Sequence, residues 1–220
     1  MSRLSRSASG ALACAVLCAP LSTLDAQRWG VGGAYHLNWG GPGSRAGDVP
    51  GYGLTLRRQL GAMATSPWEA ALSVDRFEYD LETPIHATSV DPPAGDPPVD
   101  AFTTVLRTQV DVVRRYRMGR RWTPYLSAGA GLYLIDVPDI TGNTSTGGTF
   151  ELRTESPTTG GISAGAGSEW RIVGGLTFTL AAAWSQTFTK YEVTELRTGE
   201  RGTISPFAPL GLTTRIDYRW

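Results

Sequence analysis

The chain has 220 residues, enough for one domain of ordinary size. Its 20 lysines and arginines balance its 20 aspartates and glutamates, so the formal net charge is zero and the sequence has no basic footprint for nucleic acid. The 27 glycines, the aromatic content and the scarcity of helical periodicity favour an all-β protein.

The N-terminal residues have the features of a secretory signal peptide. Two arginines precede an apolar run at residues 11–21, and the small Ala26 suits cleavage after it. The run is about half of the roughly 20 residues that a transmembrane helix needs. Both cysteines lie within this segment, so the mature chain is expected to form neither a disulfide nor a thiolate metal site. We predict a signal peptide at residues 1–26 and one β-barrel domain at residues 27–220.

The first three predicted strands lie in residues 29–81. Residues 29–39 and 51–60 alternate between apolar and polar or small residues, which is typical of strands with one apolar face. The third strand begins at Trp68 and changes phase before Phe77. We interpret this change as a β-bulge at residues 75–76.

Five further alternating segments follow. They begin at Phe102, Trp122, Gly161, Leu176 and Leu210. Residues 82–100 contain two Asp-Pro-Pro sequences and are predicted as a loop, because proline removes a backbone donor and fixes φ. The polar stretches at residues 137–159 and 190–205 are also predicted as long loops.

The connections alternate in length. They are long after strands one, three, five and seven, and short after strands two, four and six. Outer-membrane barrels have an even number of antiparallel strands, short periplasmic turns and longer external loops. The eight segments therefore predict a closed eight-stranded antiparallel up-and-down transmembrane β-barrel. A soluble barrel of lipocalin type, with its apolar face inside, is the alternative.

The last strand ends on Tyr218 and Trp220. This end resembles the closing strand of the small outer-membrane β-barrels of the OmpA/OmpX type, in which the terminal residue is aromatic and another aromatic lies two positions earlier. The resemblance implies that Tyr218 and Trp220 form the signal read by the barrel-assembly machinery. It also implies a location in the outer membrane of a Gram-negative cell envelope, after secretion through the inner membrane.

The charged residues of the polar face are predicted to fill the lumen. An eight-stranded barrel is just wide enough for its own side chains, so these charges should pair and plug the interior. Basic residues outnumber acidic ones in this set, which leaves open a narrow path for anions. The set comprises Arg28, Arg57, Glu69, Arg107, Asp111, Arg115, Glu169, Arg171, Arg215, Asp217 and Arg219.

Tryptophans near the predicted strand ends are expected to form two aromatic girdles at the membrane interfaces. They are Trp29, Trp39, Trp68, Trp122, Trp170 and Trp184.

The expected function is structural or interactive, with a plugged lumen, four long external loops that present a binding surface, and no enzymatic activity. A narrow pore for small solutes, including anions, is the first alternative, and an enzyme that modifies lipid A is the second. Lipid A deacylases carry a histidine and a serine two positions apart on one strand; here His36 has no such serine, and His86 and Ser89 form only a loop pair.

The expected partners are outer-membrane lipid, lipopolysaccharide and the barrel-assembly machinery, with no nucleic acid. We expect a monomer without cofactor or metal.

Overall fold

The computed structural model describes residues 29–39, 50–60, 66–80, 102–116, 121–143, 148–204, 208 and 210–220. The signal peptide at residues 1–26 lies outside this part of the chain and stays a prediction. None of the described residues belongs to a helix that is long and apolar enough to cross a membrane.

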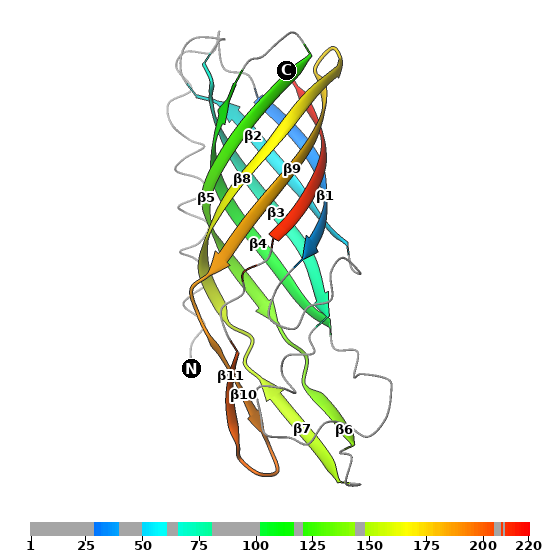
Figure 1. Cartoon of the computed structure of the whole chain (residues 1–220), viewed down its shortest axis with the longest axis vertical. Coiled ribbons are helices and arrows are strands. Elements are labelled where there is room, and N and C mark those ends of the chain that lie inside the picture. Colours follow the sequence, from blue (N-terminus) through cyan, green and yellow to red (C-terminus); the bar gives the residue numbers. More distant parts are fainter. Residues whose placement is uncertain are drawn as a thin grey trace.

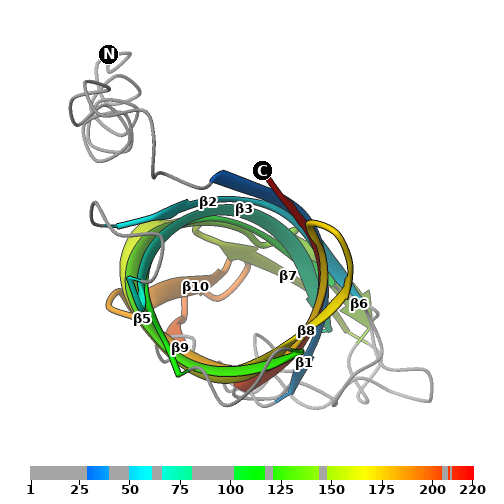
Figure 2. The ribbon, with the colours of Figure 1, turned by 90° about the horizontal axis from the view of Figure 1, so that it is seen from above.

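Eight strands close into one antiparallel barrel in the order β1-β12-β9-β8-β5-β4-β3-β2 (Figures 1 and 2). Each strand pairs with the next barrel strand along the chain, and β1 pairs with β12, so the barrel has no open sheet edge. This confirms the predicted fold class. The barrel strands are β1 (Trp29–Trp39), β2 (Gly51–Gln59), β3 (Trp68–Asp80), β4 (Phe102–Arg115), β5 (Trp122–Asp136), β8 (Thr158–Val173), β9 (Leu176–Thr187) and β12 (Leu210–Arg219).

The two faces of the barrel have the predicted orientation. Leu126 and Ile216 are 51% and 56% exposed, whereas Arg57 and Asp217 are 1% and 0% exposed. Apolar side chains therefore cover the outside, and charged side chains fill the inside. A lipocalin-type barrel would have the opposite arrangement.

The bulge predicted in the third strand is wrong. Strand β3 pairs with β2 and β4 in unbroken register, so Asp75 and Phe77 both face the lumen and Arg76 faces outward. Phe77 breaks the apolar-outside pattern because its ring packs inside, under the guanidinium of Arg107. The register shift in the barrel lies instead at the end of β8, between Arg171 and Val173.

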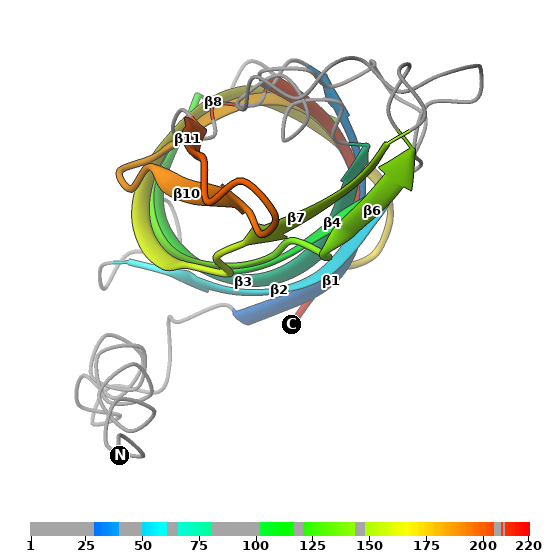
Figure 3. The ribbon, with the colours of Figure 1, turned by 90° about the horizontal axis from the view of Figure 1, so that it is seen from below.

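Two stretches predicted as loops contain strands. These are β6 (Ile140–Asn143), β7 (Thr149–Thr154), β10 (Tyr191–Glu195) and β11 (Arg201–Ile204), which form a second sheet in the order β11-β10-β7-β6. The sheet lies beyond the barrel end that is opposite the C-terminus (Figures 1 and 3). Phe150, Leu152 and Val193 are buried on one face of this sheet. We call it the external sheet.

Glycines make room for carboxylates in the barrel interior. Gly32, Gly53 and Gly129 are paired in register with Asp217, Asp75 and Asp111, respectively. A Cβ atom on Gly32 would lie 2.2 Å from Oδ1 of Asp217 and 2.8 Å from the backbone oxygen of Ile216. The missing side chain therefore lets the carboxylate lie across the neighbouring strand, which a narrow lumen requires.

We predict that Gly32→Ala destabilises the barrel by about 1–3 kcal/mol, because the added methyl group overpacks the lumen and displaces Asp217. Gly33→Ala is the matched control, since a Cβ atom there meets nothing within 4 Å. The measurement is urea unfolding of the two variants in lipid vesicles. Equal urea midpoints for Gly32→Ala and Gly33→Ala would show that Asp217 does not need the space that Gly32 leaves.

Candidate functional site

One layer of the lumen is built around Glu169 on β8. Arg57 from β2 and Arg115 from β4 donate to its two carboxylate oxygens, and Nη2 of Arg219 from β12 donates to Oε1 at 2.8 Å. Oε2 of Glu69 on β3 lies 3.6–3.7 Å from nitrogens of the same three arginines. Five strands are thus joined across the interior by one network, which we call the Glu169 layer.

Asp217 extends this network along β12. Its Oδ2 accepts hydrogen bonds from Nε of Arg215 at 2.9 Å and from the hydroxyl of Thr179 at 3.2 Å. Its Oδ1 lies 3.9 Å from Nε of Arg57. Because Asp217 is completely buried, these donors replace the water that an exposed carboxylate would have.

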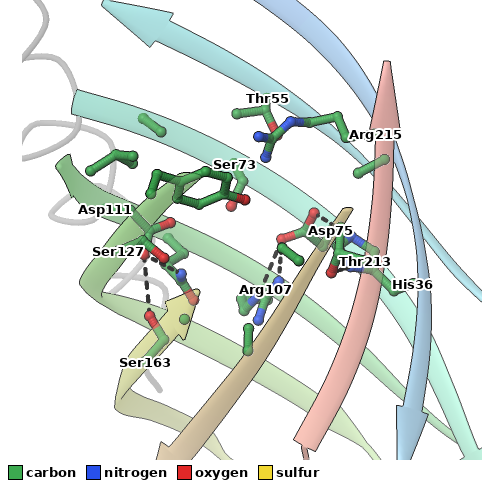
Figure 4. Close-up of a pocket in the computed structure, with 18 of the residues that line it drawn as sticks. His36, Thr55, Ser73, Asp75, Arg107, Asp111, Ser127, Ser163, Thr213 and Arg215 are labelled. Carbon is green, nitrogen blue, oxygen red and sulfur yellow. Dashed lines mark hydrogen bonds and ion pairs between the residues drawn. The ribbon is translucent and has the colours of Figure 1, made fainter. Parts of the chain in front are cut away.

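A second network lies around Asp75 (Figure 4). Its Oδ2 accepts from Nε and Nη2 of Arg107 at 3.0 and 2.8 Å, and its Oδ1 lies 3.0 Å from Nε2 of His36. A carboxylate can only accept, so Nε2 of His36 carries a proton. In the neutral tautomer, Nδ1 of His36 then accepts from the hydroxyl of Thr213, 2.9 Å away.

Asp111 is held by neutral donors. Nε2 of Gln109 lies 2.6 Å from its Oδ1, and the hydroxyl of Ser163 lies 3.2 Å from the same atom (Figure 4). The arrangement differs from the other two networks, in which guanidinium groups provide the main donors.

A cavity of about 80 Å³ lies among these groups. Its wall includes the hydroxyl side chains of Thr55, Ser73 and Ser127 and the guanidinium of Arg215. Within the described residues, Nη2 of Arg215 is buried without a hydrogen-bond partner. The cavity is polar and has room for a few water molecules, which would supply such partners.

The described lumen contains as many arginines as carboxylates. Its charged groups are Arg57, Arg107, Arg115, Arg215 and Arg219, with Glu69, Asp75, Asp111, Glu169 and Asp217.

The sequence set differs from this one at three positions. The predicted set lacks Asp75, because the assumed bulge placed this residue on the outward-facing side of β3. Ala71 and Ser73, four and two positions earlier, lie on the same inward-facing side as Asp75. Arg171 lies on the inward side of β8, in register with the buried Thr177, but its side chain is exposed at the end of the strand and is not part of the buried set. Arg28 lies outside the described residues. The excess of basic charge that favoured an anion path is therefore absent from the described set of charged lumen residues.

The predicted aromatic residues lie on the outer surface where their side chains are described. Trp68, Trp122, Trp170 and Trp184 are exposed, and Trp29 is half-buried. Trp39 ends β1, but its side chain lies outside the described part of the structure.

Tyr218 and Trp220 are also exposed, and their rings stack with centroids 6.3 Å apart. Their role as an assembly signal stays a prediction. The loop pair His86 and Ser89 lies outside the described residues. Among the residues that are described, no group of three or more His, Cys, Asp or Glu side chains could hold a metal ion.

A family model described as "Outer membrane protein beta-barrel domain" matches residues 9–199 of the chain. Two solved structures share the fold. The major outer membrane protein of Thermus thermophilus has a TM-score of 0.55 and 14% identity, with 89% of this chain and 100% of that chain covered. The outer membrane protein OprG of Pseudomonas aeruginosa has a TM-score of 0.55 and 12% identity, with 89% and 96% covered. No curated protein sequence gives a significant match.

We predict that Glu169→Gln destabilises the barrel by about 3–5 kcal/mol, because it leaves three lumen arginines with the more distant Glu69 and, for Arg57, Asp217. Glu78→Gln is the control: it removes the same charge from an outer, solvent-accessible pair with Arg76 and should cost less than about 1 kcal/mol. Urea unfolding in lipid vesicles, followed by tryptophan fluorescence, measures both. Equal losses would mean that the Glu169 layer adds no more than a surface pair.

Proposed function

The chain belongs to the outer membrane protein beta-barrel domain family, and we propose that it is a non-conducting barrel that carries a folded surface for interaction outside the cell. It is located in the bacterial outer membrane. Barrels of this membrane have short turns and both termini on the periplasmic side. The end that carries the C-terminus and the β8–β9 turn therefore faces the periplasm, and the external sheet faces the outside (Figure 1).

The Glu169 layer carries the proposal of a closed lumen. Its arginines and carboxylates come from β2, β3, β4, β8 and β12, so the hydrogen-bonded groups reach across the interior from several sides. A passing solute would have to separate buried opposite charges, and removing one partner of such a pair costs several kcal/mol. The nearby cavity of about 80 Å³ has room for only a few water molecules.

The external sheet supports the interaction role because it is folded without being part of the barrel wall. The Glu195 carboxylate accepts hydrogen bonds from the backbone of Thr198, Glu151 and Arg197, which hold its pKa below the ordinary value. The bonds from Arg197 and Thr198 close the β10–β11 turn, where Gly199 has a φ of 73°, and the bond from Glu151 joins this turn to β7. A preformed surface loses less conformational entropy on binding than a flexible loop does.

The exposed face of this sheet carries charges of both signs. Arg153 lies 3.7 Å from Asp139, and Arg201 lies 3.9 Å from Glu192. All four side chains are at least half exposed, so these pairs contribute little to stability and can be exchanged for contacts with a partner. This face suits a polar or charged macromolecular surface.

An enzyme in the lumen is not favoured by the geometry. Thr213, His36 and Asp75 form a hydroxyl–imidazole–carboxylate chain, but Asp75 is already bonded to Arg107. The adjoining cavity of about 80 Å³ is also too small for an acyl chain. We therefore interpret the chain as part of the structural network of the barrel.

We predict that the protein gives no discrete single-channel steps in planar lipid bilayers, because the Glu169 layer blocks the lumen. Electrical recording at several voltages measures this directly, with a known porin as the positive control. Reproducible unitary steps from correctly folded protein would overturn the closed-lumen proposal in favour of a narrow pore.

We further predict that a ligand of the external sheet loses at least about tenfold in affinity when Arg153→Glu and Arg201→Glu are combined, because the double change reverses two charges on the exposed face. Immobilised protein is screened against lipopolysaccharide, purified glycans and extracellular matrix proteins. Arg76→Glu on the barrel wall is the control and should leave binding unchanged. If every ligand binds the double variant as well as it binds the wild type, the external sheet is not the interaction surface.

A further inference from the structure

Asp111 in β4 has a negative charge that no lumen arginine neutralises directly. Each of the other arginines and carboxylates in the lumen networks forms an ion pair, whereas Asp111 forms none with any described residue. Its Oδ1 accepts hydrogen bonds from Gln109 and Ser163, which are both neutral. Its Oδ2 has no hydrogen-bond partner within the described part of the chain. A carboxylate enclosed in a narrow lumen without a cation is costly, so this position favours a counter-ion.

Oxygen atoms surround Asp111 on the side of the lumen cavity. Asp111 is in register with Ala71 of β3 and Gly129 of β5. Ser73 and Ser127 lie two residues further along these two strands, on the same inward-facing side, and both line the cavity of about 80 Å³ (Figure 4). Neither serine hydroxyl has a hydrogen-bond partner among the described residues. One wall of the cavity therefore offers a carboxylate and two hydroxyl oxygens.

The arginines that line the cavity are bonded to other carboxylates. Arg107 donates twice to Asp75, and Nε of Arg215 donates to Asp217 at 2.9 Å. In the Glu169 layer, three arginines share two glutamates, so the surplus positive charge of the lumen lies there. No guanidinium of that layer forms an ion pair with Asp111. The charge of Asp111 is thus left for a cation from outside the chain.

We propose that Asp111 binds a small monovalent cation such as Na⁺ in this cavity, with the hydroxyl oxygens of Ser73 and Ser127 and with water as further ligands. Hard cations bind oxygen ligands, and hydroxyl groups can turn their lone pairs toward the ion. A single carboxylate balances one positive charge, so a monovalent ion fits better than Ca²⁺, whose sites combine more negative charge. A cavity with room for a few water molecules accommodates the ion with part of its hydration shell. Water alone would give Oδ2 a hydrogen bond but would leave the charge of Asp111 uncompensated.

Urea unfolding in lipid vesicles tests this proposal, with sodium chloride compared with choline chloride at the same ionic strength. Choline has the same charge but is too bulky for a cavity of this size. Because the protein folds with the salt present, the ion needs no path into the closed lumen. When the sodium concentration is about ten times the dissociation constant, the ratio of folded to unfolded wild type should rise about tenfold over choline chloride. Asp111→Asn keeps an acceptor oxygen but loses the charge, and should unfold at the same urea concentration in both salts.

Two further variants separate ion binding from a general effect of salt. Asp136→Asn is the matched control, because it removes the same charge from an exposed position at the external end of β5 and should keep the response of the wild type. Ser127→Ala keeps the carboxylate but loses one oxygen ligand. It should raise the sodium concentration for half of the stabilisation about fivefold, and it decides the matter if Asp111→Asn does not fold.

Equal urea midpoints of the wild type in the two salts would overturn the proposal, and would mean that the Asp111 carboxyl group carries a proton or is bonded only to water. A sodium response that persists in Asp111→Asn would also overturn it, because the ion would then act elsewhere on the protein. An unchanged sodium dependence in Ser127→Ala would contradict the proposed ligands. None of these outcomes depends on whether the lumen conducts, since the measurement follows folding and not ion flow.

Discussion

The narrow interior of an eight-stranded barrel is the constraint on which this structure depends. Apolar residues are needed on the lipid-facing side of every strand, so polar and charged residues must occupy the other side, where there is little water to solvate them. Each buried guanidinium and carboxylate therefore needs a partner from another strand. The Glu169 layer meets this need for three arginines at once, and Asp75 and Asp217 meet it for Arg107 and Arg215. This pairing is the basis for the proposal that the lumen is closed.

The same constraint explains the position of the lumen glycines. A carboxylate that reaches across to an arginine must pass close to the backbone of the adjacent strand. Asp217 does so over Gly32, toward Arg57. Asp75 passes over Gly53 toward His36 in the same way, and a Cβ atom on Gly53 would lie 2.0 Å from the carboxylate oxygen. Charge pairing and backbone packing are thus not separate features of the barrel. A side chain in place of either glycine would move the carboxylate away from its partner beyond that strand, which is Arg57 for Asp217 and His36 for Asp75.

The period-two pattern and the alternating loop lengths were sufficient to predict the barrel and its eight strands. The prediction failed where an inward-facing position carries an apolar side chain. Phe77 is apolar yet faces inward beneath Arg107, so the pattern suggested a bulge and removed Asp75 from the interior. The strands of the external sheet were missed because they are only four to six residues long and have a polar outer face. The choice of Glu169 as the shared partner of three arginines depends on the register of strands far apart in sequence, which composition does not determine.

The two ends of the barrel present different chemistry because they meet different surroundings. At the periplasmic end, β8 and β9 are joined by a tight turn at Gly174 and Gly175, and Trp122 and Trp170 lie on the outer face. At the external end, β6 and β7 lie between β5 and β8 in sequence, and β10 and β11 lie between β9 and β12. Among the described strands, those of the external sheet pair only with one another, so their exposed residues can change without disturbing the hydrogen bonds of the barrel wall. The exposed face of the external sheet is therefore free to vary in sequence without loss of the buried charge pairs of the barrel.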